Sequence, residues 1–140
     1  MRTVIAALVC IGASIGLLAH HDISQTFDES RTVEVRGVVT KVFWGNPHPT
    51  IEIRQTGQDG ATMTWLLELQ AIPNELERRG WTRTSITIGE AILARGYPAR
   101  QPSATQASAT QSSTMVLVQV ARADGSQLDA SSATRWQTAR

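Results

Sequence analysis

Cysteine is nearly absent from the sequence, which has only Cys10 among its 140 residues. Cys10 lies inside an apolar N-terminal run, so the remainder of the chain has no thiol for a disulfide or a Cys-based zinc site. An excess of charge is also absent, because 13 Lys and Arg stand against 12 Asp and Glu. Nucleic acids and anionic membranes attract proteins with a basic surface, so we expect neither as a partner.

Motifs of the common catalytic classes are missing as well. The sequence has no glycine-rich phosphate loop, no nucleophile turn followed by the other members of a Ser-His-Asp set, and no reactive cysteine. We therefore expect a binding or accessory protein rather than an enzyme.

The N-terminal segment has the three-part build of a secretory signal. Arg2 supplies a positive charge, Val4–Leu18 is an uncharged apolar run, and Ala19 ends it with a small residue. The run is shorter than the roughly 20 apolar residues of a membrane helix, so we expect no stable membrane anchor. We predict a signal peptide over residues 1–19, cut after Ala19 or within a residue or two of it, and export to the periplasm.

Alternation of apolar and polar residues dominates the rest of the chain and predicts β-strands. The first of these segments changes its apolar phase at Gly37, which indicates a bulge or a sharp bend within one long strand. Asp59-Gly60 and Asp124-Gly125 are typical of tight turns. The expected strands cover residues 32–44, 50–55, 63–69, 91–97 and 114–122.

Residues 73–80 break this alternation and predict a short helix. Pro73 suits the start of a helix and Gly80 its end, where Trp81 can pack back on Leu76. Three strands, a short helix and two further strands are the element order of the OB-type barrel. We therefore predict a mainly β fold, a small five-stranded OB-like barrel with one short helix between strands 3 and 4. A small open sheet covered by one helix is the alternative.

We predict a single OB-like domain over residues 20–128, which is large enough for one hydrophobic core. Within it, residues 100–113 are rich in Ser, Thr, Ala and Gln and have almost nothing to bury, which predicts a flexible loop. Residues 129–140 are predicted to form a polar tail. Without a disulfide, packing alone must hold this domain together.

The chain has only three histidines, His20, His21 and His48. Cleavage after Ala19 would expose a terminal amine and the His20 imidazole, which together can bind one metal ion. Either His21 or His48 can add a third nitrogen, and copper suits such a nitrogen-rich site. The alternative is structural, with His48 hydrogen-bonded to backbone in a stiff, proline-flanked turn and the terminal pair binding nothing.

Trp44 and Asn46 precede His48 in the segment FWGNPHP and are candidates for contact with an organic ligand. An indole face can stack on a ring of such a ligand. The alternative function is therefore the binding of an envelope oligosaccharide, a peptide or a small molecule near these residues. Glu68, out of phase with the apolar face of its strand, and Asp28 are the acidic residues predicted to approach His48, although most such carboxylates are solvated surface groups.

Several segments together resemble a family of small exported bacterial proteins classed as a domain of unknown function. They read AHH, FD, GVVTKVFWGNPH, PNELERRGW and GY, and the resemblance covers approximately residues 19–128. Its most specific parts are the double histidine, the Asn46-Pro47-His48 turn and the Arg79-Gly80-Trp81 step. The resemblance implies export and a small β-rich domain, and it implies no activity. The long Ser/Thr/Ala/Gln loop departs from the family pattern, in which a short charged turn is expected.

Overall fold

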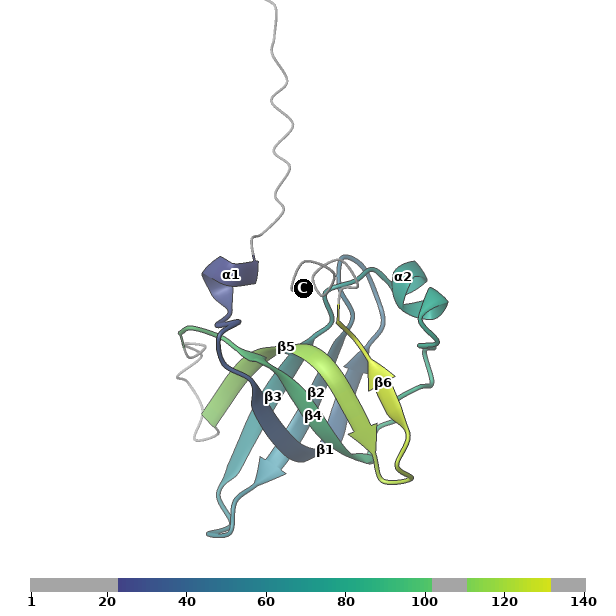
Figure 1. Cartoon of the computed structure of the whole chain (residues 1–140). Coiled ribbons are helices and arrows are strands. Elements are labelled where there is room, and N and C mark those ends of the chain that lie inside the picture. The colour runs from purple at the N-terminus through teal and green to yellow at the C-terminus, as the bar shows by residue number, and fades with distance from the viewer. Residues whose placement is uncertain (1–22, 102–110, 132–140) are drawn as a thin grey trace, which may run out of the picture.

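Five strands form a closed barrel, and along the chain a short helix lies between the third and the fourth (Figure 1). The computed structural model describes residues 23–101 and 111–131. The predicted signal peptide, His20 and His21 lie outside these residues. The barrel strands are β1 (Val33–Phe43), β2 (Thr50–Thr56), β3 (Thr62–Glu68), β4 (Ala91–Pro98) and β5 (Gln111–Arg122), the helices are α1 (Ile23–Thr26) and α2 (Pro73–Arg78), and a short strand, β6 (Gln127–Asp129), extends the sheet.

The pairing of the strands closes the sheet on itself. β2 lies between β1 and β3, and β4 lies between β1 and β5, with antiparallel pairing throughout. β3 then pairs in parallel with β5, from Met63 opposite Gln111 to Glu68 opposite Val116. This last pairing makes the sheet a barrel, which confirms the predicted OB-like architecture and excludes the open sheet.

β1 bends where it leaves β4 and joins β2. Its first half pairs with β4 and its second half with β2, and Val38 takes part in both pairings. The predicted phase change at Gly37 is wrong, because the register shifts between Val39 and Lys41. Val39 is accordingly 1% exposed and Val38 is 45% exposed. Gly37 instead permits a close approach of strands, since a Cβ there would lie 2.9 Å from the carbonyl oxygen of Arg54 on β2.

The side chains that point inward from the strands are mainly aliphatic and fill the barrel. On β3, Leu67 is fully buried, while Trp65 is partly buried and donates its indole N–H to Gln55 Oε1 at 3.0 Å. Because the described residues contain no cysteine, this packing holds the domain together. The buried cluster comprises Val35, Val39, Ile51, Ile53, Leu67, Leu69, Ala71, Leu76, Trp81, Ile86, Ile92, Ala94, Met115, Leu117, Val120 and Ala130.

α2 ends at a left-handed glycine, as the sequence predicts. Gly80 has a φ of 88°, and its N–H donates to the carbonyl of Glu77 at 3.1 Å. The N–H of Trp81 donates to the carbonyl of Leu76 at 3.0 Å, which completes a Schellman-type stop. Trp81 and Leu76 are both buried members of the core, so the chain turns the indole inward immediately after the helix.

β6 follows the Asp124-Gly125 turn and was not expected from the sequence. It pairs in antiparallel fashion with the end of β5. Ala130, just beyond it, is fully buried, and its N–H donates to the carbonyl of Val118 at 2.8 Å. The predicted polar tail began at residue 129. Residues 129–131 lie against the barrel, and residues 132–140 fall outside the described part of the chain.

Side chains from the end of α2 hold this last segment. The indole Nε1 of Trp81 donates to the carbonyl of Asp129 at 2.7 Å, and Arg79 Nη1 donates to the carbonyl of Ser131, also at 2.7 Å. These bonds occupy carbonyls that a short terminal strand would otherwise expose. The chain at the end of α2 and the chain at the end of β6 are therefore fastened to each other.

The long loop lies between β4 and β5. β5 begins at Gln111, earlier than the expected start at Thr114, so part of the predicted loop 100–113 is strand. Residues 102–110 lie outside the described part. In the part of the chain that the structure describes, no helix has both the length and the apolar character needed to cross a membrane.

Candidate functional site

The connection between β1 and β2 carries Trp44, Asn46 and His48. Pro49, at its end, is fully buried, and its carbonyl accepts a hydrogen bond from the N–H of Leu69 at 3.0 Å. This bond fastens the connection to the chain just after β3. The side chains of Asn46 and His48 are exposed, so the fastened backbone presents both at the surface.

Glu68 is the last residue of β3 and lies beside this connection. It pairs with Thr50 at the start of β2, two residues after His48 in the sequence. The carboxyl group is half-buried; burial raises the pKa of Glu68, and the neighbouring His48 opposes part of that rise. Within the described residues, the Glu68 carboxylate has neither a hydrogen bond nor an ion pair. The predicted approach of Glu68 to His48 is thus present in the structure.

A surface pocket joins Glu68 to α1. The N–H of Arg100 donates to the carbonyl of Thr26 at 2.9 Å, and its Nε donates to the carbonyl of Ser24 at 2.8 Å, which fixes α1 in place. Figure 1 shows α1 at the same end of the barrel as α2. Gln25 and Thr26 of α1 therefore line the same pocket as Glu68. The pocket is lined by Gln25, Thr26, Phe27, Glu68, Ala99, Arg100, Gln101 and Thr114.

Asp28 shapes the turn before β1. Its Oδ1 accepts hydrogen bonds from the hydroxyl of Ser30 at 2.6 Å and from the Ser30 N–H at 3.2 Å, and Arg100 lies 3.9 Å away. The Ser30 hydroxyl is the main cause of the lowered pKa of Asp28. Phe27, which is 4% exposed, forms a bridge with Ala99 of the chain after β4. The Phe-Asp pair thus fastens the N-terminal segment to the barrel.

Of the predicted metal ligands, only His48 belongs to the part that the structure describes, because His20 and His21 precede its first residue. Within residues 23–101 and 111–131, no group of three His, Cys, Asp or Glu is close enough to hold an ion. His48 and Glu68 form a pair of ligand-type side chains.

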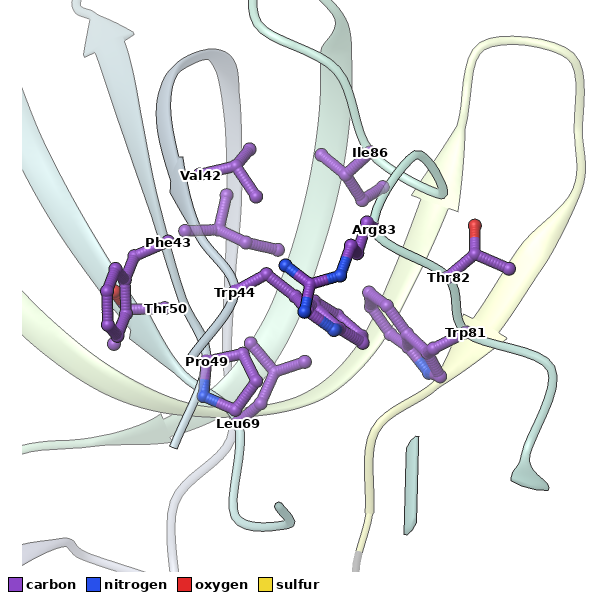
Figure 2. Close-up of a pocket in the computed structure, with 11 residues that line it drawn as sticks. Val42, Phe43, Trp44, Pro49, Thr50, Leu69, Trp81, Thr82, Arg83 and Ile86 are labelled. Carbon is purple, nitrogen blue, oxygen red and sulfur yellow. The ribbon is translucent and has the colours of Figure 1, made fainter. Parts of the chain in front are cut away.

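A second pocket lies between the β1–β2 connection and the segment after α2 (Figure 2). Trp44 packs against the core there, and its indole Nε1 is fully buried and has no hydrogen-bond partner among the residues that the structure describes. Arg83 is exposed at the same pocket. The lining residues are Val42, Phe43, Trp44, Pro49, Thr50, Ile51, Leu69, Trp81, Thr82, Arg83 and Ile86.

Sequence reasoning found some residues of both pockets and missed others. Glu68 stood out because its side chain was out of phase with the apolar face of its strand, and His48 because prolines flank it. Arg83 and Arg100 were missed, since each is a single basic residue in a connection and carries no periodic signal. Only the fold brings them to Trp44 and Glu68 respectively.

Comparison with known proteins places the chain in a family. A family model described as "Family of unknown function (DUF6152)" matches residues 7–109, which is more than half of the chain. The match includes the β1–β2 connection, Glu68 and α2. No curated protein matches the chain. The protein therefore belongs to DUF6152, a family of unknown function.

Proposed function

We propose that this protein is exported to the periplasm and binds copper without catalysing a reaction, through Glu68, His48 and the His20-His21 pair. The observation that carries this proposal is the half-buried Glu68 carboxylate, which has no hydrogen bond or ion pair within the described residues and lies beside His48. A carboxyl group taken from water without a partner is costly. A bound cation would supply the missing opposite charge.

The ligand types at this edge of the barrel suit a divalent transition metal. Imidazole nitrogen and carboxylate oxygen are both ligands for Cu(II). The residues are also well supported, because β2 and β5 flank Glu68 on β3 and the buried Pro49 anchors the chain next to His48. Rigid support of this kind fixes the direction in which ligands point.

The histidines before α1 are within reach of this pair by chain length. His20 lies three residues before Ile23, and an extended chain spans roughly 3.3–3.6 Å per residue, so about 10 Å separate them at most. Residues of α1 line the same pocket as Glu68. Cleavage after Ala19 would add a terminal amine, with an ordinary pKa of about 7.7–8.0, as a further nitrogen ligand.

His48→Ala and Glu68→Gln should each weaken Cu(II) binding by at least about tenfold, because loss of even an outer-shell partner commonly has that effect. The protein purified from the periplasm is titrated with Cu(II) against a competing chelator, after mass spectrometry has identified its first residue. Glu34→Gln is the matched control, since Glu34 is 52% exposed on β1 and paired with Arg95. Equal, weak binding by the parent protein and both site variants would refute the metal site.

Glu68→Gln should also raise the stability of the metal-free protein at pH 7, by less than about 1 kcal/mol because a half-buried carboxylate keeps part of its hydration. Burial raises the pKa of Glu68 above its unfolded value, so the native state binds the proton more tightly. The carboxylate therefore lowers stability as pH rises through that raised pKa, and the amide does not.

Urea unfolding at pH 3.5 and pH 7 measures this difference. At pH 3.5 the Glu68 carboxyl is largely protonated in both the native and the unfolded state, so the parent protein and Glu68→Gln should have nearly equal free energies of unfolding. A variant that is less stable than the parent at pH 7 would show that Glu68 has a stabilising partner. That result would remove the main support for the metal site.

The Trp44 pocket supports a second candidate function, the binding of an organic ligand near Trp44 and Asn46. A fully buried indole N–H without an acceptor is unusual in a folded protein. Asn46 is exposed two residues along the chain from Trp44 but is not among the residues that line this pocket, so Trp44 carries this candidate. Binding of an organic ligand without any response to Cu(II) would favour this candidate over the metal site.

A further inference from the structure

The buried indole N–H of Trp44 identifies a position where an acceptor is missing. Nε1 has no hydrogen-bond partner among the described residues, and it belongs to a residue that packs against the core. Leaving a buried donor unpaired is costly, because the group loses its hydration and gains no acceptor in return. By contrast, the indole N–H groups of Trp65 and Trp81 both find oxygen acceptors, at 3.0 and 2.7 Å.

Arg83 places a positive charge at the same pocket. Its side chain is exposed and, within the described residues, takes part in no ion pair or hydrogen bond. Figure 2 shows its guanidinium in front of the Trp44 indole. None of the described residues that line the pocket is acidic, so within the described part of the chain no carboxylate there competes for Arg83.

The remaining walls are mainly apolar. Val42, Leu69, Trp81 and Ile86 form part of the lining, and Phe43 at the mouth is 50% exposed. As it stands, the pocket has room for about one water molecule. Because Phe43 and Arg83 are exposed, they can shift to admit a group larger than the space they now leave.

We infer that this pocket binds a small organic carboxylate, with its apolar body against the walls and its carboxylate oxygens accepting hydrogen bonds from Trp44 Nε1 and Arg83. The inference rests on the second candidate function, is independent of the metal site and names the class of ligand. A planar carboxylate matches the forked donors of a guanidinium. A neutral sugar would leave the charge of Arg83 without a counter-ion.

Benzoate and its neutral analogue benzamide are the probes that test this inference. Binding is followed by the indole N–H signals in two-dimensional ¹H–¹⁵N NMR spectra, where the Trp44 signal is assigned by its absence from Trp44→Phe. Benzoate should shift the Trp44 signal in a saturable manner and bind more tightly than benzamide. Arg83→Gln should weaken benzoate binding about fivefold to tenfold and leave benzamide unchanged.

Arg36→Gln is the matched control, because Arg36 is also exposed but does not line the pocket. Its affinity for benzoate should equal that of the parent protein. Saturable binding of benzamide as tight as that of benzoate, or no effect of Arg83→Gln, would overturn the carboxylate inference while leaving an organic-ligand site in place. No saturable shift with either probe, alongside a single ordered water on Trp44 Nε1 in a high-resolution crystal structure, would overturn both.

Discussion

Trp81→Ala should lower the free energy of unfolding by about 3–5 kcal/mol, the range for truncating a buried aromatic side chain. Trp81 is 1% exposed within the core, so its removal leaves a cavity between the barrel and the end of α2. The change also removes the indole N–H that donates to the carbonyl of Asp129. That hydrogen bond holds the end of β6 against the chain that follows α2. Urea unfolding at pH 7, followed by circular dichroism, measures the loss.

Trp81→Phe separates the two contributions. Phenylalanine keeps most of the buried ring but has no N–H, so we expect a loss of about 1–3 kcal/mol from the unpaired Asp129 carbonyl and the smaller ring. Hydrogen exchange should become faster at the N–H of Ala130, which bonds to Val118 and depends on the docked segment. If Trp81→Ala cost no more than Trp81→Phe, the cavity argument would be wrong.

The elements that the sequence predicted correctly are those with a local signal. β2 alternates strictly, with Ile51 and Ile53 inside and polar neighbours outside. The helix stop at Gly80 depends on φ, a property of one residue that glycine satisfies best. Together with the element order, these signals were sufficient for the barrel.

The parts that failed depend on contacts between distant segments. The register shift in β1 lies where the strand stops pairing with β4 and pairs with β2. Gly37 does not mark this shift, because its small size instead allows β1 and β2 to approach closely. β6 has only three residues, and side chains just after α2 donate hydrogen bonds to its last residue and to Ser131. A short polar segment of this kind cannot be told from a tail without its partners.

The candidate site was predicted only in part for the same reason. Glu68 and His48 lie far apart in sequence, and the pairing of Thr50 with Glu68 brings them together. Trp44 was singled out for its position beside the Asn-Pro-His turn, but nothing local indicated that Arg83 would line its pocket. The β1–β2 connection thus contributes to two separate sites, with His48 beside Glu68 and Trp44 beside Arg83.

Gly96→Ala should lower the free energy of unfolding by about 3 kcal/mol or more, the upper end of the cost of overpacking. Gly96 lies on β4 where the register with β5 shifts, and a Cβ there would clash with the carbonyl oxygen of Val116. That carbonyl belongs to backbone, which cannot move aside as a flexible side chain can. The strain falls on β5, whose pairing with both β3 and β4 closes the barrel.

Gly60→Ala is the control that separates crowding from backbone conformation. Gly60 has a φ of 80°, and a Cβ there would meet nothing within 4 Å. Alanine in the left-handed region costs roughly 1–2 kcal/mol, so this variant should be only moderately destabilised in the same urea titration. Equal losses for the two variants would mean that β4 and β5 can separate enough to admit a methyl group at little cost. A much larger loss for Gly96→Ala would instead show that barrel closure depends on the absence of a side chain at this position.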